Sequence, residues 1–291
     1  MHLMKSFFVF LAIVSISVAC SSTPAVTMPD GLYIPPASVY FALAPKEAQA
    51  LQVAVIQFHR EQPINSESSL TQTQVELIGE TGEVFPVADC SWTRGTTTDQ
   101  YTMKTLHLGI PEFEEGRHLI RGLKLTQDSK QYEYNIGEWL IEVIPKPPHI
   151  LEIGKQSLLT ASGPELDLQV ELRNTGERIV TIESLDAEIP GCHYVQSVAV
   201  TRSFDDPTTI SGDDRMELEP GEMKSFFFTL AQESGEVIPD FVTVRPLLRY
   251  VDADGNVEQL LLRPVIYTVF LDTDEEVQVV AAKGKPVQII P

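Results

Sequence analysis

The sequence predicts an all-β fold: two antiparallel β-sandwich domains behind an N-terminal signal peptide and a flexible tether. Three observations support this prediction along the 291 residues: segments in which apolar and polar residues alternate, turn-forming stretches between them, and a proline-rich spacer near the middle. Alternation with a period of two is typical of half-buried strands. Many short strands separated by turns favour antiparallel sandwiches over a parallel α/β sheet.

The N-terminus has the composition of a signal peptide, which we assign to residues 1–19. Lys5 is followed by an apolar run over residues 7–19 that only two serines interrupt. A membrane-spanning helix needs about 20 apolar residues, so this run is too short to span. It ends in small residues immediately before Cys20 and resembles the lipobox of bacterial lipoproteins. The resemblance implies cleavage before Cys20, lipid attachment to its thiol and an extracytoplasmic location, anchored to a membrane of a bacterial cell envelope. The alternative is an ordinary signal peptide with a chance cysteine.

The rest of the chain divides into a tether and two domains. Residues 20–35, rich in Ser, Thr and Pro, are expected to form the lipidated, flexible tether. Three prolines within residues 145–148 cannot continue a sheet ladder and predict a stiff spacer. We therefore assign residues 36–146 to the first β-sandwich domain. Residues 147–291 form the second, which is immunoglobulin-like and ends in a C-terminal tail.

The clearest strand lies at residues 166–172, where Leu and Val residues alternate with Asp, Gln and Glu. Residues 139–143 alternate in a similar way. Two longer apolar segments, 241–250 and 260–271, are each expected to form one strand. Further strands are expected at residues 51–58, 75–78, 103–110, 118–125, 195–200 and 223–230, with Gly-, Asn- or Asp-containing turns at 79–82, 174–176 and 252–256.

A family resemblance appears in the second half. Asn174 and Gly176 form an Asn-x-Gly turn after a strand, and Pro220 and Gly221 precede a later inner strand. Gly supplies positive φ at tight turns and Asn tolerates it. Over roughly residues 150–270 this arrangement resembles the CARDB-like, immunoglobulin-like modules of bacterial surface proteins. The resemblance implies a spacer, adhesion or assembly surface, and therefore binding rather than chemistry.

Charge and cysteine content restrict the partners. The chain carries 41 acidic against 21 basic residues, a formal net charge of -20. Such a charge disfavours nucleic acid and anionic lipid surfaces as partners, because both would be repelled. Once Cys20 is lipidated, Cys90 and Cys192 remain, too few for a disulfide framework. They either bridge the two domains or stay as two reduced, buried thiols, and we slightly favour the thiols.

Catalytic motifs are absent from the sequence. It contains no Gly-x-Ser-x-Gly elbow, phosphate-binding Gly-rich loop, His-Glu-x-x-His pair or Cys-x-x-Cys pair. His107 and His118 are the histidines that could share a metal, although strand alternation directs His107 toward solvent. His193 follows Cys192 directly, and neighbouring strand residues point to opposite faces, which argues against a reactive pair. We therefore expect no enzyme activity and no cofactor.

Two acidic segments and one aromatic residue are the remaining candidates for ligand contacts. Calcium binds flexible loops rich in carboxylates, and the loop at residues 203–219 carries four candidate ligands against the alternative of a solvated surface: Asp205, Asp206, Asp213 and Asp214. The DADGN segment at 252–256 is only a fragment of a calcium loop and is better explained as a hairpin turn. Trp92 lies in a polar stretch and is the candidate for a ligand contact.

The functional expectation is a membrane-anchored, extracytoplasmic lipoprotein that binds a protein partner in the envelope or supports an envelope assembly. The membrane is contacted through the lipid on Cys20, and nucleic acid is not a partner. The first alternative is a surface lipoprotein that binds a glycan or peptide, for which a shallow aromatic-lined groove is expected. The second is a hydrolytic enzyme with an unrecognised site, for which a deep pocket with perturbed carboxylates is expected.

Overall fold

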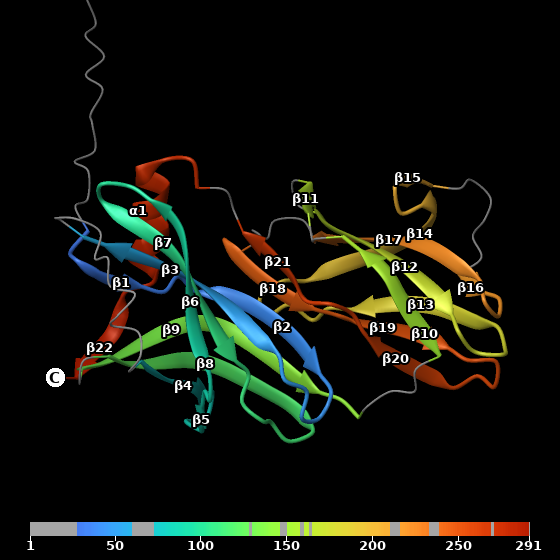
Figure 1. Cartoon of the computed structure of the whole chain (residues 1–291), viewed down its shortest axis with the longest axis horizontal. Coiled ribbons are helices and arrows are strands. Elements are labelled where there is room, and N and C mark those ends of the chain that lie inside the picture. The colour runs from blue at the N-terminus through green and yellow to red at the C-terminus, as the bar shows by residue number, and fades with distance from the viewer. Residues whose placement is uncertain are drawn as a thin grey trace, which may run out of the picture.

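The computed structural model confirms the predicted all-β sandwich fold (Figure 1). It describes residues 28–59, 73–127, 130–145, 150–157, 160–162, 165–209, 216–232, 239–268 and 271–290. The signal peptide, Cys20, the first part of the tether and residues 146–149 of the proline spacer lie outside the described residues. Figure 1 shows two sandwiches side by side along the long axis.

The first sandwich packs a smaller sheet against a larger one. The smaller sheet has the strand order β1 (Gly31–Tyr33), β3 (Ala50–Phe58), β7 (Tyr101–Gly109), β6 (Cys90–Thr97). The larger sheet has the order β21 (Val265–Thr268), β18 (Phe241–Arg245), β2 (Ala37–Leu43), β9 (Lys130–Val143), β8 (Gly116–Gln127), β4 (Gln74–Gly79), β5 (Val84–Pro86), and β22 (Pro286–Ile290) also pairs with β9. Alternating apolar side chains of both sheets, such as Leu106 and Ile141, are fully buried between them.

The second sandwich also consists of two sheets. One has the order β10 (Leu151–Gln156), β12 (Glu165–Asn174), β17 (Met223–Gln232), β14 (Tyr194–Ser203), β15 (Asp206–Thr209), with β11 (Thr160–Ser162) on β12. The other has the order β16 (Glu217–Leu218), β13 (Val180–Asp186), β19 (Leu247–Val251), β20 (Val257–Leu261). Strand β12 buries Leu166, Leu168 and Leu172 on the core side, as its alternation predicts.

Two of the strand predictions are wrong, because a proline interrupts each segment. The segment 241–250 is divided at Pro246 into β18 and β19, and the segment 260–271 is divided near Pro264 into β20 and β21. A proline has no N–H to donate to a sheet ladder, so each strand leaves one sheet at the proline and enters another. The two broken strands pair with each other on both sides of the break.

This two-stranded ribbon joins the two sandwiches. Its β19–β20 part belongs to the second sandwich, and its β18–β21 part extends the larger sheet of the first. Strand β2 pairs in parallel with β18 on one side and with β9 on the other, an arrangement the sequence did not indicate. Tyr40 and Leu140 also belong to the core cluster of the second sandwich. The domain boundary at residue 147 stays a prediction, but the parts on either side share a sheet and a core.

The folded body begins before residue 36, inside the segment expected to be a tether. Strand β1 pairs with β3, and Met28, Tyr33 and Ile34 are at most 5% exposed. The expectation of flexibility rested on the polar residues that follow Cys20. It does not extend to residues 28–35, because their apolar side chains are buried in the first sandwich.

One helix, α1 (Asp274–Lys283), lies within the expected C-terminal tail. A capping box begins it: the Thr273 side chain accepts from the Glu276 N–H, and the Glu276 carboxylate accepts from the Thr273 N–H. Its Val277 and Val280 pack with Ile56 on the smaller sheet of the first sandwich. The chain then returns as β22, so both described ends lie in the first sandwich.

Candidate functional site

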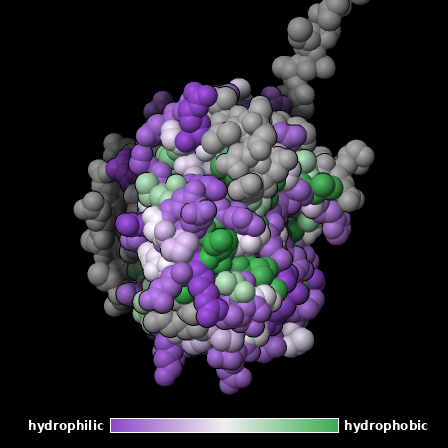
Figure 2. All heavy atoms as spheres, turned by 90° about the vertical axis from the view of Figure 1, so that its right-hand side faces the viewer, coloured by the Kyte–Doolittle hydropathy of each residue, from purple (hydrophilic) through white to green (hydrophobic). Residues whose placement is uncertain are grey.

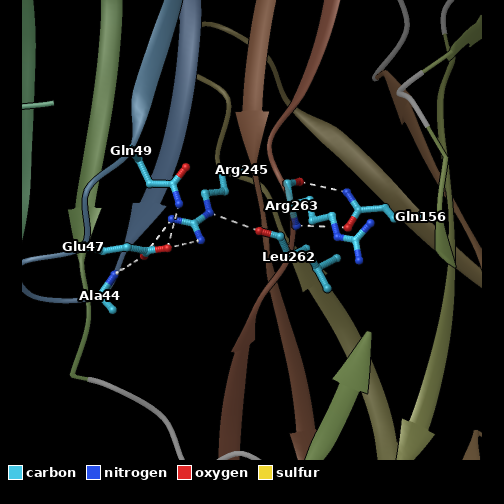
Figure 3. Close-up of polar contacts among 7 residues, drawn as sticks. All are labelled: Ala44, Glu47, Gln49, Gln156, Arg245, Leu262 and Arg263. Atoms are coloured by element: carbon cyan, nitrogen blue, oxygen red, sulfur yellow. Dashed lines mark hydrogen bonds and ion pairs between the residues drawn. The ribbon is translucent and has the colours of Figure 1, made fainter. Parts of the chain in front are cut away.

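A buried arginine and its polar partners lie where the ribbon crosses between the sandwiches (Figure 3). Arg245 is the last residue of β18, directly before Pro246, and is 6% exposed. Its guanidinium lies 5.7 Å from the ring centroid of Phe41, its partner on β2. The break in the ribbon thus places a cation inside the junction.

Glu47, from the loop between β2 and β3, neutralises this cation. Arg245 Nη1 donates to Glu47 Oε2 at 2.8 Å, and Nη2 donates to Glu47 Oε1 at 2.7 Å. The Arg245 Nε donates to the Leu262 carbonyl at 3.1 Å on the other strand of the ribbon. Such a two-pronged arginine–carboxylate pair fixes orientation as well as charge. It ties the first sandwich to the corner of the ribbon.

The loop that carries Glu47 is itself held in place. The Glu47 N–H donates to the Ala44 carbonyl at 3.1 Å, and the Glu47 carboxylate accepts from the Ala44 N–H and from Gln49 Nε2. Lys46 between them has φ 59, a region that is strained for a non-glycine residue. Burial by itself raises the pKa of Glu47, but hydrogen bonds from Arg245 and Ala44 outweigh it and lower the pKa to about 2.

The other strand of the ribbon is fixed to the second sandwich. The Arg263 N–H donates to Gln156 Oε1 at 3.0 Å, and Gln156 Nε2 donates to the Arg263 carbonyl at 2.8 Å. Gln156 ends β10, so this exchange ties the ribbon to the edge of the six-stranded sheet. Figure 3 shows Arg245 and Arg263 on opposite sides of the ribbon corner, each with its own set of partners.

A second group of charges also spans the two sandwiches. Arg117 on β8 pairs with Glu188 of the second sandwich, and Tyr40 donates to Glu142 Oε2 at 2.8 Å. Burial, followed by the hydrogen bond to Glu142, raises the pKa of Tyr40. Burial also raises the pKa of Asp186, although Arg249 lies 3.6 Å away and opposes the rise.

The polar contacts of the junction therefore hold the two sandwiches and the ribbon together. Glu47 accepts hydrogen bonds from four donors on three residues, so its carboxylate holds parts of this chain together. Neither Glu47 nor Arg245 was predicted from the sequence to be a functional residue. They lie 198 positions apart, and neither forms a local motif with its neighbours. The sequence feature that could have indicated this site is Pro246, which predicts a strand break directly after the charged Arg245.

The two cysteines lie in different core clusters. Cys90 is half-buried beside the core of the first sandwich, and its Sγ lies 3.5 Å from the Thr73 carbonyl. Burial, and then the charge of Asp89, raise the pKa of the Cys90 thiol. Cys192 is 8% exposed in the core of the second sandwich. No disulfide links these two described cysteines, which are thiols in the structure.

Trp92 lies on the edge strand β6, half-buried against the core of the first sandwich. Lys104 Nζ is 5.8 Å from the centroid of its ring. The indole Nε1 is buried and has no hydrogen-bond partner among the described residues. The Trp92 ring thus packs in part against the first sandwich. A ligand contact at Trp92 stays a prediction.

The calcium candidates are only partly described. Asp205 pairs with Lys155 at 2.9 Å and Asp206 with Arg202 at 3.4 Å, whereas Asp213 and Asp214 lie outside the described residues. Within the described part of the chain, no group of three or more His, Cys, Asp or Glu side chains could hold a metal ion.

The remaining sequence candidates have local roles. His107 Nε2 lies 2.8 Å from the Thr93 hydroxyl and His118 Nε2 lies 2.8 Å from the Glu114 carbonyl. The Asp252 carboxylate accepts from the backbone of its own turn, including the Asn256 N–H at 2.9 Å. The DADGN segment thus forms the expected hairpin turn between β19 and β20.

Comparisons with known proteins add little to this geometry. No protein-family model matches the chain, and no curated protein is similar to it. Among solved structures, it is similar to a protein of unknown function from Porphyromonas gingivalis W83, with 11% identity, 82% of this chain and 99% of that chain covered, and a TM-score of 0.24. It is also similar to the YadV chaperone, with 10% identity, 79% and 99% coverage, and a TM-score of 0.20. At these TM-scores neither similarity carries an inference. No helix in the described residues has the length and apolar character needed to cross a bilayer.

Proposed function

We propose that this protein is an extracytoplasmic lipoprotein, anchored through Cys20, that presents a protein-binding end away from the membrane without catalysing a reaction. The lipobox-like sequence before Cys20 supports the anchor. Two acyl chains on one cysteine would give stable attachment, whereas a single chain holds only marginally.

The observation that carries the proposal is the way in which the two sandwiches are joined. Strand β1, near the start of the described chain, lies at one end of the long axis, and the turns that follow β12 and β16 lie at the other (Figure 1). The ribbon and the Glu47–Arg245 pair connect these ends through a shared sheet. Two sandwiches joined in this way keep the far end of the second one at a fixed distance from the end nearest the anchor. A protein that presents a binding site away from the membrane requires such a fixed distance.

Two measurements test the proposal. The Cys20→Ser variant should lose acylation, measured by incorporation of a fatty-acid analogue, and should leave the membrane fraction. Photo-crosslinking from several exposed positions of the anchored protein in its native host should capture another envelope protein. Normal processing and unchanged membrane attachment of the variant would contradict the anchor. Absence of a captured protein from every position would contradict the binding role.

A further inference from the structure

Strand β6 forms one edge of the smaller sheet of the first sandwich, with β7 as its neighbour among the described strands. With eight residues, it is the longest edge strand in the described sheets. An edge strand presents backbone N–H and C=O groups with which another chain can pair. The edge of β6 therefore offers main-chain hydrogen bonds to an extended peptide.

The hydrogen-bond pattern of the β6–β7 ladder shows which backbone groups of β6 face outward. The Gly109 N–H donates to the Asp89 carbonyl at 2.8 Å where the ladder begins. In an antiparallel ladder, hydrogen-bonded and non-hydrogen-bonded pairs alternate. Thr93 therefore bonds to β7, whereas the N–H and C=O groups of Trp92 and Arg94 point away from β7 toward the free edge.

The side chains of Trp92 and Arg94 share the face of the sheet that is turned toward the larger sheet. Their partners on β7 are Leu106, which is fully buried in the core, and Lys104. Trp92 is half-buried, and Lys104 Nζ lies 5.8 Å from its ring centroid. Arg94 is exposed, and its Nε donates to Thr97 Oγ1 at 3.1 Å. The edge strand thus carries an aromatic ring and a cation two residues apart on one face.

Arg94 and Lys104 are two like charges that no carboxylate of the described residues neutralises. They are direct partners in the ladder, and like charges in that position destabilise a sheet. Burial, followed by the charge of Arg94, lowers the pKa of Lys104, and no carboxylate offsets this shift. An anion bound from outside the chain would remove the repulsion between them.

Two cations at the far end of the second sandwich have acidic partners instead. Figure 2 looks onto this end and shows hydrophilic residues over most of its described surface. There, Arg178 pairs with Asp254 at 2.6 Å, and Lys224 pairs with Glu222 at 3.3 Å. Acidic residues outnumber basic ones by 41 to 21 in this chain, so cations without an acidic partner indicate a position for an anion from another molecule.

We propose that the edge of β6 binds an extended segment of another protein, which adds to the sheet as a strand and places an Asp or Glu side chain opposite Arg94. That side chain would lie on the same face as Arg94 and Lys104, and the residue two positions away would contact the Trp92 ring. Main-chain hydrogen bonds supply affinity, and the carboxylate supplies selectivity. A second copy of β6 would bring its own Arg94 to these cations, which disfavours self-pairing.

This inference goes beyond the proposed function. Strand β6 belongs to the sandwich that carries β1, nearer the anchor, so it adds a second binding surface to the end that is presented away from the membrane.

Photo-crosslinking in the full-length, anchored protein in its native host tests the position of the site. A photo-reactive amino acid replaces Ser91 or Thr96, which are exposed on β6. The control position is Val257, 51% exposed on β20, which is also an edge strand. The crosslinked segment of the partner is mapped by mass spectrometry and made as a synthetic peptide. We expect capture from both β6 positions and not from Val257, with Asp or Glu in the captured segment.

Binding of that peptide to variants of the soluble protein tests the mode of recognition. Arg94→Glu should weaken binding at least about tenfold, whereas Arg178→Glu, which changes the net charge equally, should leave it unchanged. Arg94→Gln and Arg94→Pro both remove the charge, but the proline also removes the outward N–H. We therefore expect Arg94→Pro to bind more weakly than Arg94→Gln. Added salt should weaken binding to the wild type.

Several outcomes would overturn the inference without touching the proposed function. They are capture from Val257 alone, capture of a second copy of this chain or of a glycan, and a β6 crosslink that stays within the same chain. Equal weakening by Arg94→Glu and Arg178→Glu would overturn the site, and equal affinities of Arg94→Pro and Arg94→Gln would overturn strand addition. No capture from any position on the protein would overturn both the inference and the binding role.

Hydrogen exchange of the wild-type protein decides the mode of binding if Arg94→Pro does not fold by circular dichroism. The bound peptide should slow exchange at the Trp92 and Arg94 N–H groups, which face the free edge, and change it little at the Thr93 N–H, which bonds to β7. Unchanged exchange at Trp92 and Arg94 in the complex would overturn strand addition.

Discussion

The ion pair at the ribbon corner can be tested by removing its negative charge with Glu47→Gln. The substitution leaves the Arg245 guanidinium, whose side chain is 7% exposed, without a counter-charge. Breaking a buried pair typically costs about 3–5 kcal/mol. The Glu47 side chain is 26% exposed, so solvent screens part of the interaction and we expect a loss of about 2–3 kcal/mol. The control is Asp254→Asn, whose pair with Arg178 is 67% and 66% exposed and should cost under about 1 kcal/mol.

The pH dependence of this loss follows from the pKa of Glu47. The pKa falls from its ordinary value of 4.5 to about 2 in the folded protein. A carboxyl group with a lowered pKa contributes stability that is fully present above its unfolded pKa and is lost as the pH falls through the folded pKa. The difference between the wild type and Glu47→Gln should therefore be constant near pH 7 and shrink between about pH 4.5 and pH 2.

Urea unfolding of the soluble, anchor-free protein measures both effects. Trp92 and Trp139 are the only tryptophans in the sequence and both lie in the first sandwich, so their fluorescence follows that part. Circular dichroism follows both sandwiches. A cost for Glu47→Gln no larger than that of Asp254→Asn would refute the role of the pair in the joint. A cost that is the same at pH 7 and pH 2.5 would refute the electrostatic explanation.

Three further outcomes are expected. Asn174→Ala should lower the free energy of unfolding by about 2–4 kcal/mol, because the buried Leu218 carbonyl and the partly buried Arg178 carbonyl lose their donor and the Gly176 N–H loses its acceptor. Gly137→Ala should destabilise by more than about 1 kcal/mol, because φ is +89 there and a Cβ atom would lie 2.4 Å from the Ala37 carbonyl oxygen. Thiol labelling of the denatured, unreduced mature protein should modify both Cys90 and Cys192, and no labelling would indicate a bridge.

Matched variants separate these mechanisms from general effects of substitution. Asn256→Ala removes an exposed amide that donates to Asp252 at 2.9 Å and should cost under about 1 kcal/mol. Gly82→Ala has a similar strain at φ +93 but meets no atom within 4 Å. The difference between the losses in unfolding free energy for Gly137→Ala and Gly82→Ala therefore measures the steric cost of a Cβ atom where β9 lies close to β2. Chemical denaturation monitored by circular dichroism gives all four values.

Several strands were predictable from the sequence. The segment 166–172 lies within β12, and 51–58 and 223–230 lie within β3 and β17. In β12, one face is buried in a sandwich, so the period of two is visible in the residue types, whereas 223–230 includes three consecutive phenylalanines and alternates less strictly. The pairing partners were not predictable in this way, because alternation fixes which face of a strand is buried and not which strand lies beside it.

The helix α1 was missed although its start carries a recognisable signal. Thr273 and Glu276 have the spacing of a capping box, followed by an apolar pair at Val277 and Val280. The helix is only ten residues long, so its 3.6-residue pattern is short. The residues it covers, Ile56 and Phe58, are apolar on the outer side of β3.

The turn residues of the second sandwich were an informative local signal in the sequence. The resemblance to bacterial surface modules rested on Asn174, Gly176, Pro220 and Gly221 as turn formers. In the structure, Asn174 is buried, and its hydrogen bonds link the turn at 175–179 to the turn at 219–222. A polar residue that is fully buried must find partners for its amide, so a turn asparagine after a strand can fix neighbouring loops as well as its own. The same side chain therefore stabilises the sandwich and holds the Arg178 and Leu218 carbonyls close to its own turn. For this reason, Asn174→Ala should speed hydrogen exchange at the Gly176 N–H even under conditions in which the protein stays folded.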